Sequence, residues 1–216
     1  MELKNKSFRD CTLTFMDKAF KMREEKDLPV LTNWLNATNE LNEFERMQLV
    51  QHQELLDFNV HNWNEYELDV HFIGPVFSMV KFSSYEFNHF SQRELSGTVD
   101  TYFLSGKPDS IVASGRREPE KPYFACQEYK RELDPDGDPA GQALVAMLVA
   151  QQMDEDQKPM YGCYVVGSIW KFIALDTNRK YSISPDYSAL TEDIFDIFRI
   201  LKNLKQIVIE RTSHNI

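Results

Sequence analysis

The sequence predicts an α/β protein in which helices flank a mixed sheet. Both ends of the 216-residue chain place their apolar residues at helical spacing. The middle breaks into short segments that are rich in β-branched and aromatic residues and bounded by Gly or Pro. A helix, a hairpin and a final helix follow, and this order is typical of α/β domains. We expect a helical N-terminal extension over residues 1–62 and one domain over residues 63–216.

The N-terminal extension is predicted to be helical from residue 7 to residue 62. Apolar residues recur at helical spacing around Met16 and around Leu49, and Pro29 separates two of the segments. Glu and Gln, which favour helices, fill many positions between them. Nothing in this region suggests catalysis, so we expect a helical cap or an interaction surface.

A further helix is predicted to begin after Asn64, whose side chain can cap it. Glu65 and Glu67 suit the positive end of the helix dipole. An apolar stripe follows, which Pro75 interrupts and which ends near Ser83-Ser84. Its members are Leu68, Phe72, Ile73, Val76, Phe77 and Val80.

Three strands are predicted in the middle of the chain, at Val99–Leu104, Ser110–Ala113 and Tyr123–Lys130. A helix is expected next, because Asp138-Pro139 combines an N-cap residue with a proline in the first turn. Together with the helix after Asn64, these elements alternate between helix and strand as a mixed α/β sheet requires.

The C-terminal part predicts a hairpin and a helix. Met160–Val166 and Trp170–Leu175 are expected to pair about Gly167-Ser168, and a short strand at Lys180–Ser184 follows. The last helix begins after Thr191, where a capping side chain precedes acidic residues and an apolar stripe.

Composition excludes several classes of protein. The 24 Lys and Arg residues face 34 Asp and Glu residues, and the net charge of −10 argues against a protein that coats nucleic acid. A nuclease is not excluded, because an acidic site takes its positive charge from metal ions. The three cysteines form no CxxC pair, which argues against a zinc ribbon or a disulfide framework. We find no signal peptide and no apolar stretch of the ~18 residues that span a bilayer, so we expect a cytoplasmic protein without a membrane partner.

Common catalytic motifs are absent from the sequence, including GxxxxGKS/T, GxGxxG, HExxH and GxSxG. The histidines have no metal-ligand spacing. Asp134-Pro-Asp136-Gly-Asp138 resembles the start of a calcium loop, but Pro139 occupies the glycine position and Val145 the last ligand position. An acidic turn before a helix explains this segment better.

One group of residues points to metal-dependent chemistry. Pro108-Asp109 begins one predicted strand, and Glu128-Tyr129-Lys130 ends the next. Glu128 and Lys130 share a face, because alternate residues of a strand project to the same side. If the two strands are neighbours, Asp109 lies beside Glu128, and two carboxylates with a lysine are what a Mg²⁺-dependent phosphodiesterase needs. Pro-Asp and Glu-x-Lys are each common by themselves. The prediction therefore rests on the position of the two motifs on consecutive β segments between helices.

At these residues the sequence resembles the PD-(D/E)xK nuclease superfamily, over about residues 64 to 210. The resemblance implies a restriction-endonuclease-like α-β-β-β-α-β core and metal-dependent hydrolysis of nucleic acid. Asp109 and Glu128 would then be ligands of Mg²⁺ or Mn²⁺, and Lys130 would position the attacking water. The chain is also similar to a group of uncharacterised bacterial proteins of this superfamily, which indicates no substrate.

The resemblance also implies an acid on the first core helix and a glutamine on the helix after the Glu-x-Lys strand. Glu65 is the preferred match for the acid, as a direct or water-bridged metal ligand, and Glu67 is the second choice; Gln142 matches the glutamine. Structural alternatives are open at each position. Glu65 can be an ordinary first-turn acid, Gln142 can hydrogen-bond a loop, and Asp109 can pair with Lys130 in a site that has lost its activity.

The expected substrate is nucleic acid, with DNA favoured over RNA. Arg116, Arg117 and Lys121 are candidate phosphate contacts in the loop between the two strands, although such a run can also be a solvated face. A protein partner or a homodimer would supply cations that the acidic chain lacks. The alternative function is a catalytically inactive nuclease-like domain that acts as a protein-binding or regulatory module. A third hypothesis, an acid/base enzyme for a small metabolite, has no placed His or nucleophile.

Overall fold

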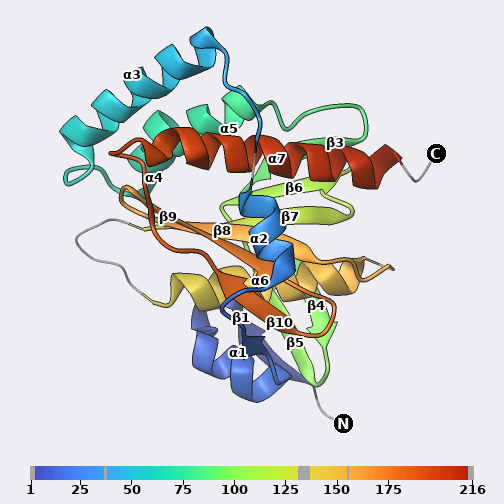
Figure 1. The fold of residues 1–216 in the computed structure, drawn as a ribbon. Helices are drawn as coiled ribbons and strands as arrows, with labels where there is room; N and C mark the ends of the chain where they lie inside the picture. The colour runs from blue at the N-terminus through green and yellow to red at the C-terminus, as the bar shows by residue number, and fades with distance from the viewer. Residues whose placement is uncertain (1–2, 37, 131–136, 155, 214–216) are drawn as a thin grey trace.

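The computed structural model describes residues 3–36, 38–130, 137–154 and 156–213, with the backbone but not the side chains of residues 125–130. The described chain forms a larger mixed sheet with helices on both faces and a smaller sheet beside it (Figure 1). This architecture confirms the α/β class and the helix-flanked mixed sheet. Within the described residues, no helix combines the length and the apolar character that a membrane span requires.

The larger sheet mixes parallel and antiparallel neighbours. β7 runs parallel to β8 and β2 runs parallel to β10, whereas β6 is antiparallel to both β3 and β7. β9 is antiparallel to β8 and to β10. In spatial order the strands are β2 (Arg23–Glu24), β10 (Lys180–Ile183), β9 (Ile169–Leu175), β8 (Met160–Val166), β7 (Pro122–Lys130), β6 (Ser110–Ser114) and β3 (Phe87–Ser91), with β11 (Tyr187–Ser188) paired to β9.

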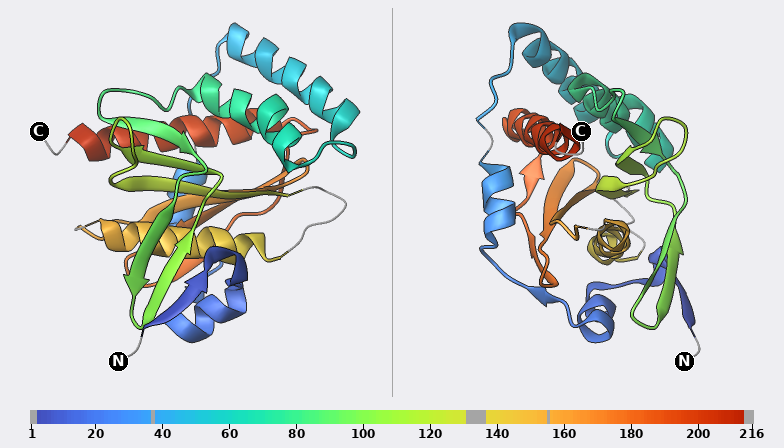
Figure 2. Two further views of the ribbon diagram at one scale, coloured as in Figure 1. Left: turned by 180° about the vertical axis from the view of Figure 1, so that it is seen from behind. Right: turned by 90° about the vertical axis from the view of Figure 1, so that its right-hand side faces the viewer.

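Two apolar cores lie on the two faces of the larger sheet, because alternate residues of each strand project to opposite sides. Val112 of β6 joins the core that also contains residues of α5 (Gly74–Val80) and α7 (Asp193–Ser213). Ile111 and Ala113 join the core around α6 (Pro139–Met153). α2 (Pro29–Leu35) and α3 (Glu43–Asn59) belong to the α7 side, where α3 forms the outermost layer (Figure 2).

α6 is enclosed on almost all sides, which explains why its sequence is apolar all round. Its residues from Ala140 to Gln151 are buried between the larger sheet, α1 (Leu13–Phe20) and β4 (Leu95–Val99). Gly97 allows β4 to approach closely, since a Cβ at this position would lie 3.1 Å from a methyl carbon of Val149.

The smaller sheet joins the N-terminus to the segment before β6. β1 (Lys4–Ser7) runs parallel to β5 (Tyr102–Gly106), which pairs with β4 in an antiparallel hairpin. Phe8, in the short helix η1 (Phe8–Asp10), packs against Gly106 so closely that no Cβ would fit there. The end of β5 and the residues that lead into β6 are therefore held by the N-terminal segment.

The helix caps predicted at Asn64 and Asp138 are confirmed. Asn64 caps α4 (Glu65–Leu68), with its Oδ1 accepting from the Glu67 N–H at 2.9 Å. Asp138 caps α6, with Oδ1 accepting from the Gly141 N–H at 2.9 Å. Its Oδ2 accepts from the Leu13 N–H at 2.8 Å, so one carboxylate also holds the start of α1. The hairpin of β8 and β9 and the C-terminal helix α7 are found where they were predicted.

The prediction of Val99–Leu104 as a strand is wrong. This segment contains the turn of the β4–β5 hairpin, where Asp100 has a φ of +52°. β6 pairs on one side with β7 and on the other with β3, a strand that follows the predicted end of the first core helix and that the sequence did not reveal. Asn88 and His89 stand between its buried residues Phe87 and Phe90, so the segment has no alternating apolar pattern.

The prediction that residues 7–62 are helical throughout is also wrong. β2 lies between α1 and α2 and pairs with β10, with Arg23 opposite Lys180. A two-residue strand carries no periodic signal, so only its pairing partner reveals it. The N-terminal residues thus add strands to both sheets, and the predicted division at residue 62 stays a prediction.

Candidate functional site

Asp109 stands immediately before β6, and a backbone hydrogen bond to the chain after β3 fixes its position. Its carbonyl oxygen accepts from the Gln92 N–H at 3.1 Å, just after β3 ends. Pro108 and Ser110, its two neighbours in sequence, are buried, whereas Asp109 itself is partly exposed. The carboxylate therefore projects from a fixed point at the end of two adjacent strands.

The strand that contains Glu128 and Lys130 is the next neighbour of β6, as predicted. Ser110 lies opposite Cys126 in an antiparallel register, and one further step of this register brings Asp109 beside position 127. The pairing of β7 with β8 shifts between Cys126 and Tyr129. The side chains of Glu128 and Lys130 lie outside the described residues, so their shared orientation stays a prediction.

The sequence analysis missed Asp69, an acid on the first core helix. Burial, and then the negative charge of Asp109, raise the pKa of Asp69 to about 6. The charge of Asp109 therefore adds to the effect of burial, which is the larger of the two. Asp69 follows Glu65 by four residues and so shares its helical face, a signal that was present in the sequence.

The other acids of this helix have different surroundings. Glu67, the second choice for a metal ligand, belongs to the capping box: its carboxylate accepts from the Asn64 N–H at 2.8 Å. Glu65 is exposed at the first turn of α4, which packs against β7. Its proposed role at the metal site stays a prediction.

Asp69 begins a wide turn inside this helix. Residues 69–73 form the π-helical turn η2 (Asp69–Ile73), and the Gly74 N–H donates to the Asp69 carbonyl. Turns of this kind are frequent at functional sites. A Cβ at Gly74 would lie 3.0 Å from that carbonyl oxygen and 3.7 Å from Oδ1 of Asp69, so glycine leaves room beside the carboxylate.

His89 supports the strand next to Asp109. Its Nε2 lies 2.9 Å from Oγ of the buried Ser110, and its ring stacks on Phe77 with 5.2 Å between ring centroids. Burial lowers the pKa of His89 to about 4, so the imidazole is neutral at neutral pH. The side chain therefore holds Ser110, the first residue of β6, as a neutral group.

The buried neutral state of His89 predicts a loss of stability in acid. Its unfolded pKa is about 6.5, so the unfolded chain binds the extra proton first, and stability falls as the pH drops from about 6.5 to about 4. We expect wild type to lose up to about 3 kcal/mol more than His89→Gln over this range, by urea unfolding at both pH values. Protonation of Asp69 changes the stability in the opposite direction over this pH range, but it does so in both proteins, so its contribution cancels in the comparison. Equal losses in the two proteins would contradict the prediction.

Gln142 is buried in the first turn of α6, a helix that packs against β7. A Cβ at Gly137 would lie 2.7 Å from its Nε2, so the amide packs directly against the chain that enters the helix. This contact agrees with the alternative in which Gln142 supports a loop. Its role at the metal site stays a prediction.

The candidate phosphate contacts lie at the opposite end of β6 from Asp109. The loop with Arg116 and Arg117 leaves β6 after Ser114, about 17 Å along the strand from its start. Lys121 makes an ion pair of 2.7 Å with the buried Asp154, so its charge already has a structural partner. Arg116 and Arg117 are exposed, and their role stays a prediction.

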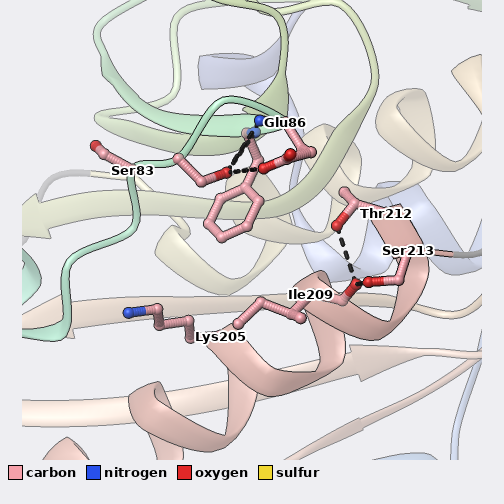
Figure 3. Close-up of a pocket in the computed structure, with 8 residues that line it drawn as sticks. Ser83, Glu86, Lys205, Ile209, Thr212 and Ser213 are labelled. Carbon is pink, nitrogen blue, oxygen red and sulfur yellow. Dashed lines mark hydrogen bonds between the residues drawn. The ribbon is translucent and has the colours of Figure 1, made fainter. Parts of the chain in front are cut away.

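A pocket of about 350 Å³ between the start of β3 and the end of α7 is a weaker candidate (Figure 3). Its polar groups bind one another or the backbone: Ser84 Oγ lies 2.8 Å from Glu86 Oε2, and Lys205 Nζ donates to the Val80 carbonyl at 3.1 Å. Phe87 lines this pocket and pairs with Ser114, whereas Ser91 pairs with Ser110 beside Asp109. The pocket thus lies at the other end of β3.

Asp69 and Asp109 form the described part of a site that fits a divalent cation. Carboxylate oxygens are the ligands that Mg²⁺ and Mn²⁺ prefer, and the mutual repulsion of the pair is relieved by a positive charge. Among the side chains that the structure describes, no group of three or more His, Cys, Asp or Glu residues gathers in this way. The third ligand expected from the sequence, Glu128, belongs to the part of β7 without described side chains.

Comparison with known proteins adds no relative: the chain matches no model of a known protein family, and no curated protein is significantly similar to it.

Proposed function

We propose that this protein is a metal-dependent phosphodiesterase that hydrolyses nucleic acid, with a core of the PD-(D/E)xK type. The order of elements supports the proposal: the helix over residues 65–80 is followed by β3, β6, β7, α6 and β8. The pairing of these strands, antiparallel twice and then parallel, also fits an α-β-β-β-α-β core. The hairpin of β4 and β5 is then an insertion between the first and second core strands.

The observation that carries the proposal is the position of Asp109, which is fixed at the start of β6 beside the strand of Glu128 and Lys130. Its negative charge adds to the burial that raises the pKa of Asp69 on the first core helix. Repelling acids destabilise a fold, so an acid kept under the influence of Asp109, beside the strand of Glu128 and Lys130, calls for a functional reason. The structural alternative, a salt bridge between Asp109 and Lys130, would need only one carboxylate.

In this proposal Asp69, Asp109 and Glu128 hold Mg²⁺ or Mn²⁺, with Glu65 as a further direct or water-bridged ligand. When bound, the ion supplies positive charge to the phosphate oxygens and lowers the pKa of a coordinated water. Lys130 orients the attacking water or steadies the negative charge that develops on the phosphate. His89 keeps Ser110, and with it the start of β6, in place.

Cleavage assays on single- and double-stranded DNA and RNA test the proposal, with Mn²⁺, Mg²⁺ or EDTA present. We expect metal-dependent cutting by wild type, and a loss of roughly a hundredfold or more in both Asp109→Asn and Lys130→Ala. Asp186→Asn is the matched control, because this exposed acid pairs with Lys171 away from β6. Cutting that survives both substitutions would point to a contaminant or to a different site.

The inactive binding module is a second candidate, and the exposed apolar side chains of α3 favour it. A thermal shift with Mn²⁺ distinguishes the two functions, because a ligand that binds only the folded state raises its stability. Stabilisation that Asp109→Asn removes supports the metal site. The absence of both cutting and stabilisation would favour the binding module.

A further inference from the structure

α3 is fixed to the rest of the protein along one side. Leu49 and Leu56 are fully buried there. The Gln53 side-chain amide donates to the carbonyl oxygens of Ala189 and Thr191, at 2.8 Å each. Glu45 pairs with Lys202 of α7 at 3.0 Å. The helix is therefore held in one orientation, and its opposite side is permanently presented to solvent.

The exposed side of α3 carries a row of large apolar side chains. Phe44, Met47, Leu55 and Phe58 are spaced so that they share one helical face, and we call them the apolar row. Phe44 is 64% exposed and Phe58 is 83% exposed. α3 is the outermost layer of the molecule, so nothing from the described chain covers this face (Figure 2). The exposed Gln51 stands between Met47 and Leu55 on this face, so the row consists of two apolar pairs. Exposed apolar groups rimmed by polar residues mark interaction sites.

The two edges of the apolar row differ in charge. Glu43, Glu54 and Asp57 follow one edge and are exposed, and Arg46 is the one cation among them, so this edge keeps a net negative charge. Gln48 and Asn59 follow the other edge and are uncharged. A partner that covers the row therefore meets net negative charge along one side only.

We propose that the apolar row docks another protein through an apolar helix that has Lys or Arg along one side. The charge pattern selects this occupant, because basic residues would lie against the acidic edge. A second copy of this chain fits less well: in an antiparallel pair of α3 helices the two acidic edges would face each other, and each chain has a net charge of −10. The inference goes beyond the proposed activity and does not depend on it.

Two designed peptides test this interface on the full chain. Both are amphipathic helices of about 18 residues, the length of α3, and carry Leu on one face. One has Lys along one side and the other has Glu at the same positions. By fluorescence anisotropy we expect the Lys peptide to bind wild type at least about tenfold more tightly than the Glu peptide. The double variant Phe44→Ser/Phe58→Ser should lose this binding, whereas Tyr85→Ser, at a residue that is 92% exposed outside α3, should keep it.

Charge reversal separates the edge from the general acidity of the protein. In Glu54→Lys/Asp57→Lys we expect the preference to move toward the Glu peptide, because both acids belong to the same edge. Equal binding of the Lys peptide by wild type and by the Phe44→Ser/Phe58→Ser variant would overturn the proposal. So would a wild-type dimer in sedimentation that this variant dissociates, because the occupant would then be a second copy. Circular dichroism of each variant confirms that α3 is still folded.

Discussion

Asp69→Asn is expected to remove metal-dependent cleavage and, at the same time, to stabilise the metal-free protein. The carboxylate would be lost from the metal site, which should lower the cleavage rate by roughly a hundredfold or more. In the absence of metal, its negative charge is partly buried away from water and is also repelled by Asp109, which together raise the pKa of Asp69 to about 6. Removing that charge relieves the repulsion. A purely structural acid would give no such pair of opposite effects.

The pH dependence of this gain in stability follows from the direction in which folding shifts the pKa of Asp69. An acid whose folded pKa lies above its unfolded value lowers stability once the pH exceeds the unfolded value. The gain from Asp69→Asn should therefore be absent below about pH 4, grow up to about pH 6 and stay constant above it. We expect about 1 kcal/mol at neutral pH after allowing for solvent screening of this partly exposed group, or a rise in Tm of about 2–4 °C.

Thermal unfolding with and without Mn²⁺ is the measurement. Wild type should be stabilised by Mn²⁺ and Asp69→Asn should not, so the variant is the more stable protein without metal and gains nothing with it. Asp57→Asn, at an exposed acid on α3, is the control for a change of one charge. Lower stability of Asp69→Asn at neutral pH would show that Asp69 holds the fold together and is not strained by Asp109.

Trp34→Ala is expected to have the largest effect on stability. The indole of Trp34 is buried and makes edge contacts with Tyr161 and Phe172 of the larger sheet, at 5.0 and 5.2 Å between ring centroids. Its Nε1 donates to the carbonyl of Ile200 in α7 at 3.0 Å. Truncation would leave a large cavity and remove this hydrogen bond between α2 and α7, so we expect a loss of about 3–5 kcal/mol.

Urea unfolding measures this loss, with Phe58→Ala as a control that should stay within about 0.5 kcal/mol of wild type because Phe58 is exposed. The result also tests the predicted division at residue 62. A single transition that Trp34→Ala shifts as a whole would make α2 part of the same cooperative unit as the sheet. A small effect would instead support a separate N-terminal extension.

Local patterns revealed the elements that are specified by neighbouring residues. The caps at Asn64 and Asp138 follow from side chains that bind an N–H a few residues further on. α6 and the hairpin of β8 and β9 are long enough to show their periodicity. The consecutive order of Asp109 and Glu128 on neighbouring strands was predicted for the same reason, because a β-hairpin links segments that are close in sequence.

The errors occur where the partner is distant in sequence. β2 is formed by pairing with β10, more than one hundred and fifty residues away, and β1 by pairing with β5. β3 has too few apolar residues to be recognised, and its place next to β6 defines it. Asp69 was overlooked because helix periodicity gives it the same face as Glu65 but says nothing of its burial or of the charge of Asp109 that acts on it.

Short-range periodicity and turn chemistry encode the α/β class, the caps at Asn64 and Asp138, and the strands β6 and β7, so these features could be read from the residues alone. The effect of Asp109 on the pKa of Asp69, the ion pair of Lys121 with Asp154 and the N-terminal strands in both sheets could be found only in the folded protein. These contacts form between segments far apart in the chain. Their free energy depends on burial and charge in the folded protein, which no local pattern of residues records.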